Sequence, residues 1–412
     1  MDVEKELQED GKGLDFQSLA ALKPEEKLLS SIDYSRPLNE YGTAEQISSF
    51  LRSRDKSHHV YTYDLNVFGK AIQDDMEKYL AAGEYYNSSA LKEGFKSPLH
   101  LFYARESGWK EELSRYQDRK NYFELGTFLH MAVLEPTRFK RVTVEPRKSL
   151  STKDGVNSLI QFWESKIQIN GVCFVNGEST SPESGFNSAR LAVRQMGLDI
   201  NKMDGLKEYY RFLKSISGFE SVSEENKTII DIAYHNYKRY AGGMLFDLVK
   251  HSKREISLYY TDPGTGLKVR VRPDAMQFEE NIGCNAIISV KTTRAESIDQ
   301  FAYQSAKLQY EISEGMYLEV ASGVTGRDFR AVIMIMIQTV PPFGVAALVW
   351  DAEDIEIGKY KYHQSLQTAL ECEESGLYPG YDAFSENGHL GLIQFKQPGF
   401  NAKDLLPIDL KI

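Results

Sequence analysis

The sequence lacks any apolar run long enough to cross a membrane, and its first residues lack the basic and apolar regions of a secretion signal. Its mean hydropathy is -0.42 and hydrophobic residues make up 42% of it, which is ordinary for a globular protein. The length of 412 residues allows one large α/β domain with additions or several smaller domains. We therefore predict a cytoplasmic protein without a membrane-spanning segment.

Cysteine is scarce as well: Cys173, Cys284 and Cys372 are odd in number and far apart in the sequence. A disulfide framework is therefore not expected, and a four-cysteine zinc or iron–sulfur site cannot be completed from this chain. We interpret the three as small buried side chains. A P-loop is also missing, because the glycines of the GTG at Gly264 to Gly266 are not followed by the required lysine and serine or threonine.

The sequence carries an excess of negative charge, with 49 basic and 59 acidic residues and a net charge of -10. Such a balance argues against a protein that binds nucleic acid over its whole surface, but it does not exclude a local basic cleft. A DNA enzyme of this composition has to concentrate its lysines and arginines in one place.

Hydrophobic periodicity predicts alternating helices and strands in the second half of the chain. The expected elements are a helix over 225–249, a hairpin over 254–278, a strand over 285–293, a helix over 297–320, strands over 331–338 and 344–350, and a helix over 359–375. The DPGTG turn of the hairpin has the residues that such turns need. This mixture predicts an α/β (α+β) fold with a mixed central β-sheet flanked by helices.

The first half of the chain divides in two near residue 82. Two amphipathic helices are predicted over 43–53 and 68–82, before a helix that Ser88 or Ser89 can cap. We assign a mainly helical N-terminal extension and a main domain that contains an insertion. The extension covers residues 1–81, the main domain covers 82–412, and the insertion lies near 142–225.

Within the main domain, ELGTFLHMAVLEPTRF has helical spacing, and Pro136 ends that helix. The insertion is predicted to contain a strand over 172–175 and a polar loop over 176–188, NGESTSPESGFNS, beside helical stretches. No internal repeat is visible.

Two successive predicted strands carry polar groups that metal-dependent phosphodiester hydrolysis requires: oxygen ligands and a cation near the attacked phosphate. The hairpin supplies Asp274, and the next strand supplies Ser289 and Lys291. Side chains two apart in a strand share a face, so Ser289 and Lys291 are expected to point into one site.

The same parity places Lys268, Arg270 and Arg272 on the face of Asp274 if the strand is regular. We predict that these three side chains contact DNA phosphates, since a phosphate substrate requires a basic surface. The alternative is that KVRVR is the solvated face of an edge strand.

These motifs resemble the exodeoxyribonuclease VIII-like (RecE-type) branch of the PD-(D/E)XK nuclease superfamily. RVRPD followed by IISVKTT is similar to the core motif of that branch, where an acid, any residue and a lysine precede two threonines. NSSALKEGFKSPLHLFYA resembles its opening helix, ELGTFLH its glycine-to-histidine motif, REISLYYTDPGTGLKVRVRPD its acid-bearing hairpin and GLYPGY its closing turn. The resemblance spans about residues 82–384 and implies a restriction-endonuclease-like core.

The resemblance implies a site that binds Mg²⁺, or Mn²⁺. His130 and Asp274 would be metal ligands, Glu255 matches the acid that precedes the hairpin, and Lys291 would position or activate water and stabilise charge on the phosphate. Asp274, Glu255 and the backbone carbonyl of Val290 are a set that could hold one ion. A histidine in an apolar helix can instead be a core residue, and Glu255 can be a solvated strand end. Lys291 lies in a buried strand, where an unpaired ammonium is costly.

Two positions depart from the family. Ser289 stands where the second carboxylate belongs, and Ser313 stands where a glutamine usually precedes a tyrosine, here Tyr317, by four residues. The loss of a negative charge weakens metal binding, although Mg²⁺ can be held by one or two carboxylates with waters. A carboxylate on the following helix, Glu311 or Glu314, is a candidate replacement.

Two functions follow from the resemblance. The first is a metal-dependent exonuclease that hydrolyses one strand from the ends of double-stranded DNA, in phage-type recombination, as a homo-oligomer with a single-strand annealing protein as partner. The second is a catalytically impaired relative that binds DNA ends or a recombination partner, which Ser289 and Ser313 favour.

Overall fold

The computed structural model describes residues 69–73, 76–105, 121–384 and 392–393. The helix predicted over 43–53 lies outside them. Among the described residues, no helix combines the length and the apolar character needed to cross a bilayer. The described part is a mixture of helices and mixed sheets, which confirms the predicted α+β class.

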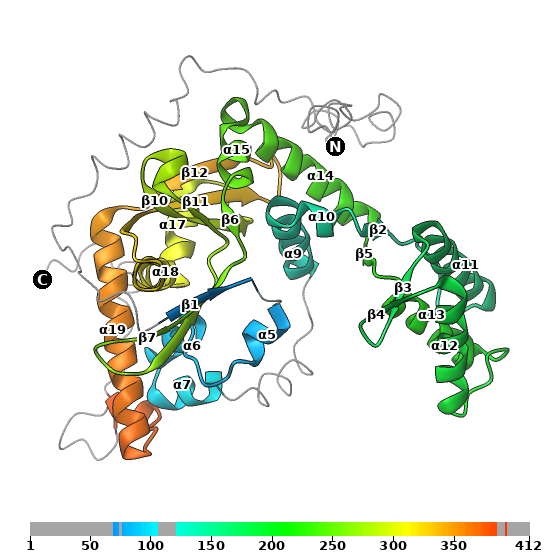
Figure 1. Cartoon of the computed structure of the whole chain (residues 1–412), viewed down its shortest axis with the longest axis horizontal. Coiled ribbons are helices and arrows are strands. Elements are labelled where there is room, and N and C mark those ends of the chain that lie inside the picture. Colours follow the sequence, from blue (N-terminus) through cyan, green and yellow to red (C-terminus); the bar gives the residue numbers. More distant parts are fainter. Residues whose placement is uncertain (1–68, 74–75, 106–120, 385–391, 394–412) are drawn as a thin grey trace, which may run out of the picture.

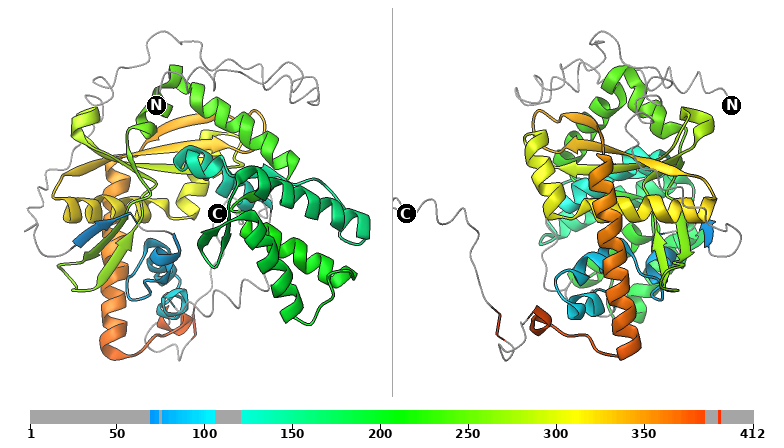
Figure 2. Two further views of the ribbon diagram at one scale, coloured as in Figure 1. Left: turned by 45° about the vertical axis from the view of Figure 1, so that its right-hand side comes forward. Right: turned by 90° about the vertical axis from the view of Figure 1, so that its left-hand side faces the viewer.

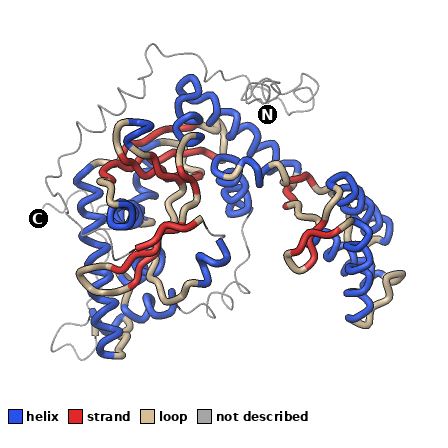
Figure 3. The backbone as a smooth tube through the Cα atoms, in the orientation of Figure 1, coloured by secondary structure: helices blue, strands red, loops and turns tan. Residues whose placement is uncertain are grey.

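A five-stranded mixed sheet, whose red strands lie in the upper left part of Figure 3, is the largest sheet among the described residues. Its order is β12-β11-β10-β9-β6. The strands are β6 (Lys253–Arg254), β9 (Ala275–Gln277), β10 (Asn285–Thr293), β11 (Phe329–Gln338) and β12 (Val345–Val349). β10 and β11 are parallel and the other neighbours are antiparallel, so the predicted mixed sheet is confirmed.

The predicted hairpin belongs to a second sheet, with the order β1-β7-β8. Its strands are β1 (Gly69–Ile72), β7 (Ser257–Thr261) and β8 (Lys268–Val271). In the turn, the Asp262 carboxylate accepts hydrogen bonds from the amide and the hydroxyl of Thr265, which fixes the reversal.

The helix predicted over 68–82 is wrong in its first part, because β1 pairs with β7 and the helix begins only at Met76. Pairing with a neighbouring strand overrides the local helical pattern here. Gly69 permits the close approach, since a Cβ there would lie 2.6 Å from a Val324 methyl and 2.9 Å from the Tyr259 carbonyl oxygen.

Helices cover both faces of the central sheet (Figure 1). α9 (Asn121–Leu134) and α14 (Glu224–Arg239) pack on the side chains of Ile288 and Val290, whereas α18 (Tyr310–Thr325) and α19 (Ala352–Ser375) pack on the side of Ile287. α19 extends from the sheet to α7 (Figure 2). The other helices of this part are α5 (Met76–Ala81), α6 (Ser88–Gly94), α7 (Pro98–Arg105), α10 (Pro136–Phe139), η1 (Tyr240–Gly243), α15 (Met244–Lys250), α16 (Glu279–Ile282), α17 (Ile298–Lys307) and η2 (Tyr381–Phe384).

Two predicted long helices are each broken. The helix expected over 297–320 divides into α17 and α18 at Gln309, which has a left-handed φ of 52°. The helix expected over 225–249 divides into α14 and α15, because Ala241 and the two glycines after it have positive φ. The cap of α6 is also corrected, since the Asn87 side chain accepts from the Ala90 amide.

The segment from β2 (Val142–Val144) to β5 (Glu220–Val222) forms a helical unit with its own core around the fully buried Trp163 and Leu213. It contains α11 (Lys153–Asn170), β3 (Cys173–Val175), β4 (Glu178–Thr180), α12 (Pro182–Gln195) and α13 (Met203–Ile216), at the right of Figure 1. The loop expected over 176–188 is wrong, because Ser181 caps α12 within it. The division into an extension, a main domain and an insertion stays a prediction.

Candidate metal centre

A cleft of about 1990 Å³ opens beside the central sheet. This volume exceeds the roughly 300–1,000 Å³ of sites for drug-sized ligands. Of the charged residues that line it, eight are basic and three acidic, in a chain with a net charge of -10. They are Arg138, Arg141, Lys253, Arg254, Arg272, Lys291, Arg294 and Lys307, with Glu135, Glu255 and Asp274. The charged lining of the cleft is therefore mostly basic, which favours anions over cations.

Asp274 occupies the point at which β9 and β10 separate. The pairing of these strands ends at Ala275 and Ile288, one residue after Asp274 in the chain. Beyond that point, the Val290 amide donates to Asp274 Oδ2 at 2.6 Å instead of to a strand neighbour. The carboxylate is thereby fixed just before the start of β9 and faces the cleft.

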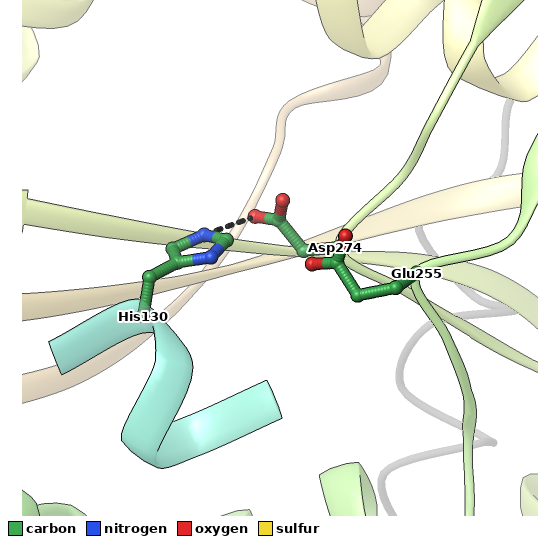
Figure 4. A group of neighbouring side chains, drawn as sticks. All are labelled: His130, Glu255 and Asp274. Carbon is green, nitrogen blue, oxygen red and sulfur yellow. Dashed lines mark ion pairs between the residues drawn. The ribbon is translucent and has the colours of Figure 1, made fainter. Parts of the chain in front are cut away.

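His130 reaches Asp274 from α9, with 3.2 Å between its Nε2 and Asp274 Oδ2 (Figure 4). One turn earlier, a Cβ on Gly126 would lie 2.9 Å from the Thr292 hydroxyl of β10. Gly126 therefore lets α9 lie close to β10, and this approach explains why a glycine precedes the histidine by four residues.

Glu255 completes the cluster from the segment between β6 and β7. It has a positive φ of 55°, which is uncommon for a residue with a side chain, and its amide donates to the Asp274 carbonyl at 3.2 Å. Arg272 Nε donates to Glu255 Oε2 at 2.8 Å. One ligand atom from each of His130, Glu255 and Asp274 lies within 4.8 Å of the others.

This cluster fits a divalent metal ion. Carboxylate oxygens and an imidazole nitrogen are common ligands of divalent ions in proteins, and the open cleft leaves room for waters or substrate oxygens. A strained backbone at Glu255 is the kind of outlier that clusters at functional sites. The three side chains could therefore hold a metal ion, whose identity the donor set does not fix.

Lys291 projects from β10 into the same cluster. Its Nζ lies 3.9 Å from Asp274 Oδ2, 3.8 Å from Glu314 Oε1 and 5.4 Å from the centre of the Tyr310 ring. Burial alone would lower the pKa of Lys291, but the carboxylates of Asp274 and Glu314 outweigh it and raise that pKa. The ammonium group therefore stays charged.

The charges of the cluster depend on one another. Burial would raise the pKa of Asp274, but His130, Lys291 and the Val290 amide lower it to about 2. Burial would lower the pKa of His130, but Asp274 raises it above its usual 6.5. Burial raises the pKa of Glu255 despite its pair with Arg272. Asp274 is thus the permanent anion of the centre.

The parity argument for Lys268, Arg270 and Arg272 is wrong, because the strand is not continuous: β8 ends at Val271 and Asp274 precedes β9 of the other sheet. Arg270 is only 4% exposed, and its guanidinium donates to the carbonyls of Tyr79 and Ala82, so it cannot meet DNA. Lys268 is exposed on the hairpin and does not line the cleft.

Arg272 does line the cleft, but it is mostly buried and bonded to Glu255 and, at 2.8 Å, to the Ser257 hydroxyl. This position favours a role for Arg272 in orienting the Glu255 carboxylate over a direct contact of Arg272 with phosphate. Other basic lining residues were not predicted from the sequence. Arg294 directly follows the VKTT run, so its proximity to the lysine motif was an available signal, whereas Lys307 at the end of α17 carries no such signal.

The two departures from the family motif have different surroundings. Ser289 is fully buried, and its hydroxyl donates to Glu314 Oε2 at 2.7 Å. Ser313 lies against Ser88, with 3.1 Å between their hydroxyl oxygens. Tyr317 lines the cleft, and burial raises its pKa well above the usual 10.0.

The two candidate replacement acids point in different directions. Glu311 Oε1 accepts from Lys361 of α19 at 2.7 Å. Glu314 faces Ser289 and Lys291. A second lysine, Lys92 of α6, was also missed: its Nζ lies 5.5 Å from the Tyr310 ring, and burial lowers its pKa to about 8.

No protein-family model matches the chain, and no curated protein matches it. Among solved structures, the chain is similar to one from Eubacterium rectale described as a "Putative exonuclease", with 11% sequence identity and a TM-score of 0.38, covering 81% of this chain and 99% of the other. A likeness at this level establishes neither a shared fold nor a shared activity.

Proposed function

We propose that the chain is a divalent-metal-dependent nuclease that hydrolyses phosphodiester bonds of DNA. The observation that carries the proposal is the convergence of His130, Glu255 and Asp274 beside Lys291 in a basic cleft. The resemblance of the sequence motifs adds that it acts from the ends of double-stranded DNA as an exonuclease.

Each residue has a defined part in this proposal. His130, Glu255, Asp274 and the Val290 carbonyl would hold Mg²⁺ or Mn²⁺, which when bound polarises a phosphoryl oxygen and lowers the pKa of water. The Lys291 ammonium stabilises the charge that develops on the phosphate. Arg294 and Lys307, which are exposed in the cleft, hold the flanking phosphates.

The direct test is release of nucleotides from linear duplex DNA with Mg²⁺ or Mn²⁺, compared with closed circular DNA. We expect release from the linear substrate, and a loss of about 100-fold or more in Asp274→Asn, because a metal ligand is removed. Asp231→Asn is the matched control, since Asp231 forms an ion pair with Lys227 on α14 and does not line the cleft. Equal rates in both variants would sink the proposal.

A second candidate is a protein that binds DNA ends, or a recombination partner, without hydrolysis. The neutral Ser289 in place of an acid favours it, because the site then has one negative charge fewer for a divalent ion. Binding of linear DNA with no release of nucleotides at millimolar Mn²⁺ would select this function.

A further inference from the structure

Glu314 is a carboxylate in an unusual place. It lies on α18 with 0% of its side chain exposed, among residues of the face that packs on β10. Burial raises its pKa, which the nearby Lys291 and the Ser289 hydroxyl only partly oppose. A buried carboxylate is costly unless it is compensated, so a carboxylate retained here requires a reason.

One carboxylate oxygen of Glu314 accepts no hydrogen bond among the described residues. Oε2 accepts from Ser289, whereas Oε1 is buried and makes no hydrogen bond among the described residues. The nearest opposite charge is Lys291 Nζ, at 3.8 Å from Oε1 and 3.9 Å from Asp274 Oδ2. The ammonium group therefore pairs with two carboxylates at nearly equal distances.

The packing of α18 directs Glu314 inward. Gly358 of α19 allows backbone contact at this turn, since a Cβ there would lie 2.0 Å from the Glu311 carbonyl oxygen. Glu311, three residues earlier, bonds to Lys361 instead and takes no part in the cluster. Both glutamates are buried on the same helix, but the Glu311 carboxylate points to Lys361 and the Glu314 carboxylate points to Ser289.

We propose that Glu314 supplies the negative charge that position 289 lacks, and that it is a positioning residue that, together with Asp274, holds Lys291 in place. The proposal rests on the proposed nuclease function. Ser289 suits this arrangement, because its hydroxyl donates to the Glu314 carboxylate. An aspartate at 289 would instead bring a second negative charge against that carboxylate.

The test relocates the acid. We expect Glu314→Gln to lower the turnover rate on linear DNA by about 10- to 100-fold with little change in KM for DNA, because the side chain is buried and acts through Lys291. Glu311→Gln is the matched control, with an expected change under about threefold. Ser289→Asp alone is expected to lose activity, because two carboxylates would share one buried space. Combined with Glu314→Gln, it is expected to restore most of the rate.

A readout apart from activity is the affinity for Mn²⁺ by calorimetry. Glu314→Gln is expected to weaken binding about tenfold, because Lys291 then faces Asp274 uncompensated, whereas Glu311→Gln leaves it unchanged. Thermal unfolding of each variant checks that it is folded. If the unaltered chain hydrolyses DNA but Glu314→Gln behaves as Glu311→Gln does, or if the double variant is no faster than Glu314→Gln, the inference is wrong and the nuclease function stands. If the unaltered chain neither binds Mn²⁺ nor hydrolyses DNA, both fall.

Discussion

Asp274 connects every group of the candidate centre. Its Oδ2 atom lies 3.2 Å from His130 Nε2, 2.6 Å from the Val290 amide nitrogen and 3.9 Å from Lys291 Nζ. These groups lower the pKa of Asp274 to about 2, so its carboxylate carries no proton at neutral pH. A metal ion that binds here must therefore displace a proton from His130, whose pKa is raised, and not from Asp274.

This competition predicts a pH dependence of metal binding. A ligating imidazole is neutral, and the pKa of His130 lies above 6.5 in the unloaded site. Below that raised pKa, the affinity for Mn²⁺ is expected to fall about tenfold per pH unit, with one proton released per ion. Calorimetry between about pH 6 and 8, in buffers of different ionisation enthalpy, measures both quantities.

The control for this prediction is His251→Gln, which changes an exposed histidine that does not line the cleft. His130→Gln is expected to remove the pH dependence and weaken binding. An affinity that does not change with pH in the unaltered chain would rule out His130 as a ligand that must lose its proton.

Among the elements, the bounds of strand β10 could be predicted from the sequence. The helix break beside it and the direction of the Glu314 side chain could not. The apolar run of β10 with Ile287, Ile288 and Val290 predicts a buried strand over 285–293, the bounds that the structure has. The break at Gln309 was missed, because nothing in a helical pattern marks a left-handed glutamine. The inward direction of Glu314 depends on how α18 crosses the sheet, so the sequence left Glu311 and Glu314 as equal alternatives.

The prediction that Lys268, Arg270 and Asp274 share one face was wrong because the chain changes sheets between them. Lys268 and Arg270 lie two apart in β8, whereas Asp274 precedes β9 of the other sheet, so spacing along the sequence does not give a shared face here. His130 and Glu255 could be assigned only through the resemblance, because they come from separate elements and meet Asp274 through tertiary packing.

The contact between α18 and α19 gives a prediction at the scale of elements. Gly358→Ala would place a methyl group 2.0 Å from the Glu311 carbonyl oxygen, so the helices must move apart at the turn that carries Glu314. We expect a loss of about 1–3 kcal/mol in the free energy of unfolding and a lower rate of hydrolysis. Denaturant unfolding and the nuclease assay measure these effects.

Gly83→Ala serves as the control for this substitution, because a Cβ on Gly83 meets nothing within 4 Å. A Gly358→Ala variant as stable and as active as Gly83→Ala would show that the close helix contact does not position Glu314.

The whole molecule separates its charges. The chain is acidic with a net charge of -10, whereas the charged residues that line the cleft are mostly basic. Such an arrangement repels anions from most of the surface and attracts them to one place. Under the proposed function, this arrangement would let an acidic chain bind DNA in the cleft alone.

Salt dependence tests this separation. Affinity for DNA is expected to fall linearly on a logarithmic scale with salt concentration, and Arg294→Ala or Lys307→Ala is each expected to reduce the slope by about 1, because one phosphate contact is lost. Lys96→Ala is the control, since Lys96 is exposed beside Glu93 and does not line the cleft. Equal slopes in all variants would place the DNA elsewhere.

The central claim, that His130, Glu255 and Asp274 form a metal centre, is tested most directly by anomalous diffraction from crystals grown with millimolar Mn²⁺. The account predicts a manganese peak within about 2.0–2.6 Å of an Asp274 carboxylate oxygen, with His130 Nε2 and a Glu255 oxygen at similar distances. No peak at this position, or a peak only at another group of acids, would contradict it.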